Sequence, residues 1–261
     1  MRYAQCPALI EAHLTDPPPT LTDQAAVTAR ETAHGAIGQF FVQLTFDGQP
    51  IEQGCERTHI IYNITMLTVV IQAGGQSSRM GEDKALKPFL GKPLIQRVME
   101  RLAPIADEVI VTTNRPEAYT FLNVRLSPDL KPGRGALGGL YTAVASASHD
   151  LVAVVACDMP FASPQFFESA THLLVQEEAD VVIARSDEGY EPFHALYRRA
   201  TCLPAIAAAI EADLWKVIAW FPQVNVRTLS PDEIKTFDPS GLCFWNVNTP
   251  EEFQQAEQLE K

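Results

Sequence analysis

The sequence predicts an α/β fold, with a mostly parallel sheet and helices on both faces, and three observations support this. From Met66 onward, short β-rich runs alternate with helical stretches, which is typical of a parallel sheet covered by helices. The runs Leu67 to Ile71 and Leu151 to Ala156 carry no charge and indicate buried strands. Between them, apolar side chains recur at helical spacing at Leu94, Ile95, Val98, Met99 and Leu102.

Residues 1 to 65 do not continue this alternation. They contain three successive prolines, Pro17 to Pro19, and two short β-like runs, Phe40 to Phe46 and Ile60 to Ile64. Segments below about 60 residues are marginal as independent domains even when they are well patterned. We therefore expect residues 1–65 to be an N-terminal extension, poorly ordered or produced by a misplaced start codon, and residues 66–261 to form the domain.

Local signals define the elements after the first strand and helix. Glu108 to Thr113 predicts the strand that completes a βαβ unit. The glycine-rich stretch Gly133 to Leu140 is expected to form a flexible loop that leads into a helix over Leu140 to Ala147, and the strand Leu151 to Ala156 follows. Ser163-Pro164 starts the next helix, because serine caps a helix and proline suits its first turn.

The last part of the chain continues the alternation. Asp180 to Ala184 is strand-like, and so is the apolar part of Glu191 to Arg199, where we expect His194 to be packed in the interior and not catalytic. Thr249 to Glu252 starts a final helix, with a capping threonine, a proline in the first turn and two acids near the positive helix end.

Composition argues against several classes of function. The net charge of −12, without a cluster of Lys and Arg, argues against nucleic-acid binding. No apolar run approaches the roughly 20 residues that cross a bilayer, so we expect no membrane span. The five scattered cysteines form no CxxC pair and fit free thiols better than a disulfide framework or a zinc site, which favours a cytoplasmic location.

A glycine-containing loop, Ala73 to Lys84, follows the first strand. Gly74 and Gly75 allow several backbone N–H groups to converge on an anion. Arg79 adds a planar fork of donors and Lys84 a point charge, so the loop is expected to bind a triphosphate. Its place at the carboxyl end of a strand favours ligand binding over a plain tight turn. The loop matches neither GxGxxG nor the P-loop, which argues against nicotinamide chemistry and P-loop NTP hydrolysis.

The loop resembles the opening signature of the molybdenum cofactor guanylyltransferase family, which is a strand followed by AGG, SxRMGxDK and GKPL. These segments are Ala73 to Gly75, Ser77 to Lys84 and Gly91 to Leu94 here, and the resemblance extends over nearly all of residues 66–261. It implies a Rossmann-like nucleotidyltransferase fold and GTP binding by Gln72, Ala73, Gly74, Gly75 and Lys84. Gln72 departs from the family, since many members carry an apolar residue there; if that backbone lies under the base, glutamine alters the base contacts.

Asp158 is the strongest candidate for a metal ligand. It follows the strand Leu151 to Ala156 and therefore projects from the same sheet edge as the glycine loop. Nucleotidyl transfer needs its developing charge neutralised, usually by Mg²⁺ held on one or two carboxylates. The alternative is an aspartate that caps a turn before Pro160. We expect Mg²⁺ as the cofactor.

The resemblance assigns roles to further polar residues. A CDxP segment carries the family's Mg²⁺-binding aspartate, which falls on Asp158, while Asn114 and Asp129 match positions that bind the guanine nucleotide. An amide and a carboxylate suit guanine, because its N1–H and exocyclic amine are donors and its O6 is an acceptor; the alternative for both is a turn. In the NVNTP segment, Asn246 and Asn248 alternate on a strand and face one side, where they contact the pterin or the metal's water shell, or only bond backbone at a turn.

The predicted reaction is transfer of GMP from GTP to the terminal phosphate of molybdopterin, with release of pyrophosphate. Lys84, Arg79 and Asp158 are the expected catalytic residues, and no general base is needed because the attacking phosphate is already anionic. One alternative is a cytidylyltransferase acting on the same pterin, against which the paired Gly74-Gly75 argues. Another is a non-catalytic nucleotide- or cofactor-binding protein, against which the presence of both Lys84 and Asp158 argues. Besides GTP and molybdopterin, transient partners would be cofactor-delivery proteins or molybdoenzymes.

Overall fold

The computed structural model describes residues 39–41, 45–46, 49–50, 61–63, 66–74, 83–186 and 189–260. The chain divides into two compact units, Met1–Ile64 and Thr65–Lys261. In the first unit, β1 (Gln39–Phe41) pairs with β4 (Ile61–Asn63), and β2 (Thr45–Phe46) pairs with β3 (Gln49–Pro50), both antiparallel. These strands fall within or next to the two β-like runs, whereas the expectation of poor order for residues 1–65 concerns mostly residues outside the described part.

The second unit is built on a seven-stranded sheet in the order β13-β11-β12-β10-β5-β8-β9. In chain order, the strands are β5 (Leu67–Gln72), β8 (Glu108–Thr112), β9 (Arg125–Ser127), β10 (Leu151–Ala156), β11 (Val181–Ser186), β12 (Gly189–Arg198) and β13 (Val226–Leu229). All neighbours pair in parallel except β12, which is antiparallel to β10 and β11. The prediction of a mostly parallel sheet is confirmed.

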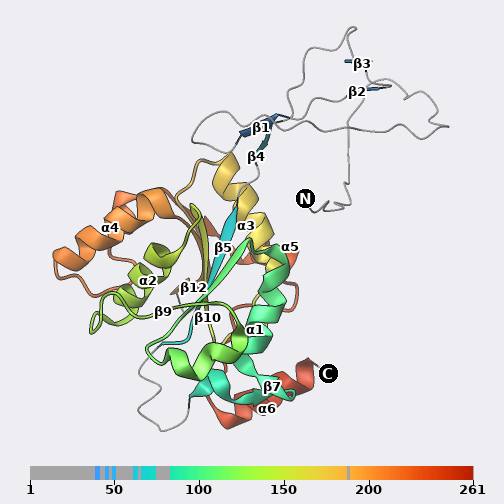
Figure 1. The fold of residues 1–261 in the computed structure, drawn as a ribbon, viewed down its shortest axis with the longest axis vertical. Coiled ribbons are helices and arrows are strands. Elements are labelled where there is room, and N and C mark those ends of the chain that lie inside the picture. Colours follow the sequence, from blue (N-terminus) through green and yellow to red (C-terminus); the bar gives the residue numbers. More distant parts are fainter. Residues whose placement is uncertain are drawn as a thin grey trace. The chain divides into compact units, whose positions relative to one another are not determined.

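Five helices cover the two faces of this sheet. Helices α1 (Leu94–Leu102), α3 (Pro164–Gln176) and α5 (Pro231–Phe237) pack on one face, in a core with the buried side chains Val69 and Ile71. Helices α2 (Gly135–Ser146) and α4 (Arg199–Glu211) pack on the other. Figure 1 shows the sheet between these two layers. None of the described helices is long and apolar enough to cross a membrane.

Smaller elements complete the second unit. The hairpin β6 (Pro88–Phe89) and β7 (Lys92–Pro93) packs with the final helix α6 (Pro250–Leu259) in a separate apolar cluster. Short 3₁₀ helices lie in the connections: η2 (Lys84–Leu86), η3 (Ala103–Ile105), η4 (Pro116–Leu122) and η5 (Phe221–Gln223).

Helix starts follow the predicted caps. The Ser163 hydroxyl accepts a hydrogen bond from the Phe166 N–H, and Thr249 forms a capping box with Glu252. The prediction for His194 is also confirmed, because its side chain is fully buried among phenylalanine rings. Burial lowers the pKa of His194 to about 3, so the ring is neutral, and its Nε2 accepts from the Ser163 N–H at 3.2 Å.

Two element predictions were wrong. The helix expected from Leu140 begins at Gly135, because the glycines that suggested a loop lie inside it; a Cβ on Gly138 would meet the carbonyl oxygen of Lys131 at 2.7 Å. The NVNTP segment is not a strand, so Asn246 and Asn248 do not share a strand face. This segment is held by a backbone bond from Val247 to the loop after β10, at Asp158, and not by a ladder.

Candidate active site

The loops after β5, β8 and β10 leave the sheet at one edge. Gln72, the last residue of β5, pairs with Thr112 of β8 and with Ala156 of β10. Beyond the strands, the Ala73 N–H donates to the Thr112 carbonyl at 2.9 Å, and the Cys157 N–H donates to the Gln72 carbonyl at 3.1 Å. These bonds fix Ala73 and Cys157, the first residues after β5 and β10, against the neighbouring strands. The predicted site residues that follow β5, β8 and β10 therefore lie at the same edge of the sheet.

The glycine loop is described only at its two ends. The chain is described to Gly74 and again from Asp83, so the predictions for Gly75 and Arg79 lie outside the described residues. Lys84 is described, and its Nζ donates a hydrogen bond to Oδ1 of Asn248 at 2.9 Å. The NVNTP segment therefore meets the end of the glycine loop.

The same segment also meets the loop that carries Asp158. The Val247 N–H donates to the Asp158 carbonyl oxygen at 2.9 Å, and Asn248 follows directly with its contact to Lys84. The structure thus brings together Lys84, Asp158 and Asn248, which are far apart in the sequence. Asn246 lies beside them, where its carbonyl oxygen accepts from the Asn248 amide at 3.4 Å.

Asp158 has the properties of a carboxylate that accepts a cation. Burial raises the pKa of Asp158, while a backbone hydrogen bond and the Lys84 charge oppose that increase. Within the described part of the chain, no side-chain hydrogen bond to its carboxylate is present, and the Lys84 amine bonds Asn248 instead. A partly buried, unpaired carboxylate gains most from a bound cation. The donor set fits Mg²⁺, which prefers oxygen ligands and usually takes one or two carboxylates beside phosphate oxygens and water.

No ready-made cluster of metal ligands accompanies Asp158. Among the described residues there is no group of three or more His, Cys, Asp or Glu side chains arranged to hold a metal ion. Burial and the nearby carboxylates raise the pKa of the Cys157 thiol well above its usual range, and Mg²⁺ prefers oxygen ligands to sulfur. Oxygens of a bound nucleotide and of water could complete the coordination of a metal held by Asp158.

Asn114 and Asp129 form a hydrogen-bonded pair next to this edge. The Asn114 Oδ1 accepts from the Asp129 N–H at 3.0 Å. One oxygen of Asp129, Oδ1, accepts from the Lys131 N–H and from the Thr142 hydroxyl, each at 2.9 Å. The Asp129 Oδ2 and the Asn114 Nδ2 have no partner among the described residues. The pair thus offers one acceptor and one donor, as the edge of guanine requires.

The Gln72 side chain supports α2. Its Nε2 donates to the Gly139 carbonyl at 2.8 Å, and a Cβ on Gly139 would lie 3.4 Å from its Oε1. The glutamine therefore ties the end of β5 to the second turn of α2, and its contact with a nucleotide base stays a prediction.

Two residues at this edge had no role in the sequence interpretation. Arg134, just before α2, binds Asp213 at 2.6 Å and the carbonyls of Ile210 and Leu214 at 3.1 and 3.0 Å, and its guanidinium lies 4.5 Å from the Trp215 ring centre. Asp83 bonds the Arg115 guanidinium and the Tyr119 hydroxyl. The only sequence signal for Asp83 was its place in the quoted SxRMGxDK motif, directly before Lys84.

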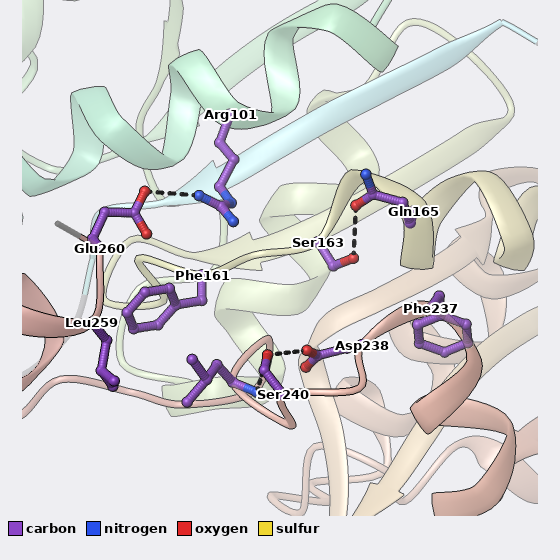
Figure 2. Close-up of a pocket in the computed structure, with 10 residues that line it drawn as sticks. Arg101, Phe161, Ser163, Gln165, Phe237, Asp238, Ser240, Leu259 and Glu260 are labelled. Carbon is purple, nitrogen blue, oxygen red and sulfur yellow. Dashed lines mark hydrogen bonds and ion pairs between the residues drawn. The ribbon is translucent and has the colours of Figure 1, made fainter.

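A recess of about 260 Å³ lies elsewhere, between the end of α1, the start of α3 and the end of α6. Figure 2 shows that its polar side chains face one another. Arg101 pairs with Glu260 at 3.0 Å, and the Asp238 carboxylate accepts from the Ser240 hydroxyl and the Cys243 N–H. No predicted site residue lines it. The Arg101–Glu260 ion pair at this recess ties the end of α6 to α1.

A mostly parallel sheet, a glycine loop after its first strand, and a lysine and an aspartate brought to one edge define a nucleotidyltransferase of Rossmann-like α/β fold. The comparison with protein families identifies the group within this class. Residues 69–226 match the model of the MobA-like NTP transferase domain, and the chain belongs to this family.

Curated relatives agree with this membership. The chain is 35% identical over 197 residues to a probable molybdenum cofactor guanylyltransferase of Peptoclostridium acidaminophilum, covering 74% of this chain and 89% of the relative. It is 34% identical over 198 residues to the molybdenum cofactor guanylyltransferase of Vibrio campbellii, covering 75% of this chain and 97% of the relative.

A solved structure shares the fold. The crystal structure of molybdopterin-guanine dinucleotide biosynthesis protein A from Archaeoglobus fulgidus superposes with a TM-score of 0.63 at 25% identity, covering 74% of this chain and 97% of that chain. The predicted family and fold are confirmed.

Proposed function

We propose that this protein transfers GMP from GTP to the terminal phosphate of molybdopterin and releases pyrophosphate. The names of its relatives support this, since several are molybdenum cofactor guanylyltransferases that this chain covers almost completely. The structural observation that carries the proposal is the meeting of Lys84 and Asp158 through the segment Val247–Asn248.

In the proposed reaction, an oxygen of the pterin phosphate forms a bond to the α-phosphorus of GTP while the bond to the pyrophosphate oxygen breaks. The attacking oxygen is already anionic, so the protein supplies alignment and charge stabilisation. Lys84 and Arg79 would bind the triphosphate, and the backbone of Ala73, Gly74 and Gly75 would approach the nucleotide closely. Bound Mg²⁺, held by Asp158, would neutralise charge on the leaving pyrophosphate.

Base recognition in this proposal uses the Asn114–Asp129 pair. The Asp129 Oδ2 accepts from the guanine N1–H or its amine, and the Asn114 amide N–H donates to O6; neither group has a partner among the residues that the structure describes. The two unused groups and the bond between the residues support this assignment. On the acceptor side, Asn246 and Asn248 contact the pterin or support the metal's water shell, and Asn248 also orients Lys84.

We also infer a cytoplasmic location and transient contact with cofactor-delivery proteins or molybdoenzymes, since a dinucleotide cofactor must pass to the enzymes that use it. Neither alternative function is favoured. The named relatives are guanylyltransferases and not cytidylyltransferases. The presence of both Lys84 and Asp158 argues against a protein that only binds nucleotide, because mere binding tolerates the loss of a metal ligand.

The proposal is tested with the full chain, Mg²⁺ and molybdopterin, with each nucleoside triphosphate added separately and pyrophosphate release followed. We expect release only with GTP and only with the pterin present. Asp158→Asn should abolish most of it, whereas the control Glu168→Gln, which removes an exposed carboxylate of α3, should not. Release with CTP instead would assign the cytidylyltransferase activity, and no release with any nucleotide would refute enzymatic transfer.

A further inference from the structure

The Asp83 carboxylate receives three hydrogen bonds although its motif gave it no role. Its Oδ1 accepts from the Ala85 N–H at 3.1 Å, which caps η2. Its Oδ2 accepts from the Arg115 guanidinium and from the Tyr119 hydroxyl. The Asp83 side chain is only 16% exposed. With both oxygens engaged by the protein, this carboxylate has little capacity left for a metal ion or a substrate.

The partners of Asp83 belong to the segment that carries Asn114. Tyr119 lies in η4 and is fully buried, and burial together with the Asp83 charge raises the pKa of its hydroxyl, which therefore remains a donor. Arg115 directly follows Asn114, and its N–H donates to the Thr113 hydroxyl at 3.1 Å. Asp83 thus holds the loop after β8 at two points beyond Asn114.

Asp83 also holds Lys84. The cap fixes the backbone of η2, where the Leu86 N–H donates to the Asp83 carbonyl at 3.0 Å, and Lys84 follows at the first helical position. A continuous set of contacts therefore runs from Asn248 and Lys84, through Asp83, to the loop with Asn114 and on to Asp129.

We propose that Asp83 is a positioning residue that fixes the spacing between Lys84 and the Asn114–Asp129 pair, and that this spacing contributes to the choice of a guanine nucleotide. The inference rests on the proposed function, in which Lys84 binds the triphosphate and the pair binds the base. A nucleotide contacts both ends at once only if their separation matches its length. When the link is lost, the phosphates still bind, but the base contacts are no longer in register with them.

The competing role is that Asp83 is a second metal ligand beside Asp158. The two roles differ in what Tyr119 does. If Asp83 positions the loop, removal of the Tyr119 hydroxyl reproduces the effect of changing Asp83. If Asp83 binds metal, Tyr119→Phe releases its carboxylate and does not weaken the metal's effect, whereas Asp83→Asn raises the Mg²⁺ requirement.

The experiment compares Asp83→Asn and Tyr119→Phe with the control Tyr197→Phe in the full chain. Tyr197 is also fully buried, and its hydroxyl donates to the Pro192 carbonyl at 2.7 Å, so its loss costs a similar hydrogen bond elsewhere in the sheet. Equilibrium titrations with GTP and with CTP in the presence of Mg²⁺ give the two dissociation constants. A Mg²⁺ titration of pyrophosphate release gives the half-activating metal concentration.

We expect both test variants to bind GTP about tenfold more weakly, as loss of one hydrogen bond to a charged group allows, with a smaller change for CTP and an unchanged Mg²⁺ midpoint. The control should match the wild type. If Asp83→Asn does not fold, Arg115→Gln tests the same link from the half-exposed side. If the wild type prefers GTP and both test variants keep the same ratio of GTP to CTP dissociation constants, the inference about Asp83 is refuted and the proposed function stands. A change in the half-activating Mg²⁺ concentration in Asp83→Asn but not in Tyr119→Phe also refutes the inference. A wild type without preference for GTP overturns the proposed function and the inference with it.

Discussion

Arg134 joins the glycine-rich start of α2 to the end of α4, and its replacement by alanine should cost a measurable part of the stability. Its ion pair with Asp213 contributes only about 0.2–1 kcal/mol, because the Asp213 side chain is 77% exposed. The two bonds to the Ile210 and Leu214 carbonyls contribute about 0.5–1.5 kcal/mol each. Stacking on Trp215, which is 57% exposed, adds about 0.5–1 kcal/mol.

The free energy of unfolding of Arg134→Ala should therefore fall by about 2–5 kcal/mol, measured by urea denaturation followed by tryptophan fluorescence and by circular dichroism. Arg185→Ala is the matched control, since Arg185 lies over the Tyr190 ring at 5.5 Å and its loss should cost no more than about 0.5–1 kcal/mol. Equal free energies for Arg134→Ala and the wild type would show that these contacts do not hold the two segments together.

Three further predictions follow from single contacts. Asp158→Asn should lower the rate of pyrophosphate release by about 10²–10³-fold, while Glu168→Gln leaves it unchanged. Gly138→Ala should destabilise the protein by about 1–3 kcal/mol in urea, because the new Cβ would lie 2.7 Å from the backbone of the preceding loop; Gly139→Ala, whose Cβ meets only the end of a glutamine side chain at 3.4 Å, should cost less. His194 should make the protein less stable in acid. Its pKa is about 3 in the folded protein and about 6.5 in the unfolded chain, so the unfolded chain binds the extra proton, and stability is lost as the pH falls from about 6.5 towards 3. His194→Gln should flatten that part of the stability profile.

Each of these has a contradicting result. Unchanged pyrophosphate release in Asp158→Asn would remove this residue from the metal site. Equal costs for the two glycine variants would mean that the loop before α2 moves aside freely. A pH profile that is the same with and without His194 would place the acid sensitivity in other groups.

The sequence predicted what depends on local pattern and on the geometry of parallel sheets. Uncharged runs identified β5 and β10 as buried strands, and the rule that ligands bind at the carboxyl edge placed Asp158 beside the loop of Lys84. The caps at Ser163 and Thr249 required only neighbouring residues, and both were correct.

What could not be predicted depends on contacts between distant segments. Gly138 and Gly139 suggested a loop in the sequence. The structure shows why glycine stands there, since α2 approaches Lys131 and Gln72 closely at these two positions, and this contact exists only in the folded chain. The NVNTP segment was predicted as a strand from the alternation of Asn246 and Asn248. The bond that holds it, from Val247 to the loop after β10, joins distant segments and leaves no local signal. The link from Asp83 to Tyr119 spans 36 residues and leaves no periodic signal. The roles given to Gly75 and Arg79 stay predictions.

The antiparallel strand β12 affects where the chain should tolerate insertions and deletions. Because β12 runs against its neighbours, its hairpin with β11 turns at the carboxyl edge, and α4 returns to that edge after it. The loops of β5, β8 and β10 are locked to one another by backbone bonds, so insertions there disturb all three. A change in the length of the β11–β12 hairpin should disturb these three loops less than an insertion within them, because the hairpin closes on its own strand pair, Ser186 with Gly189.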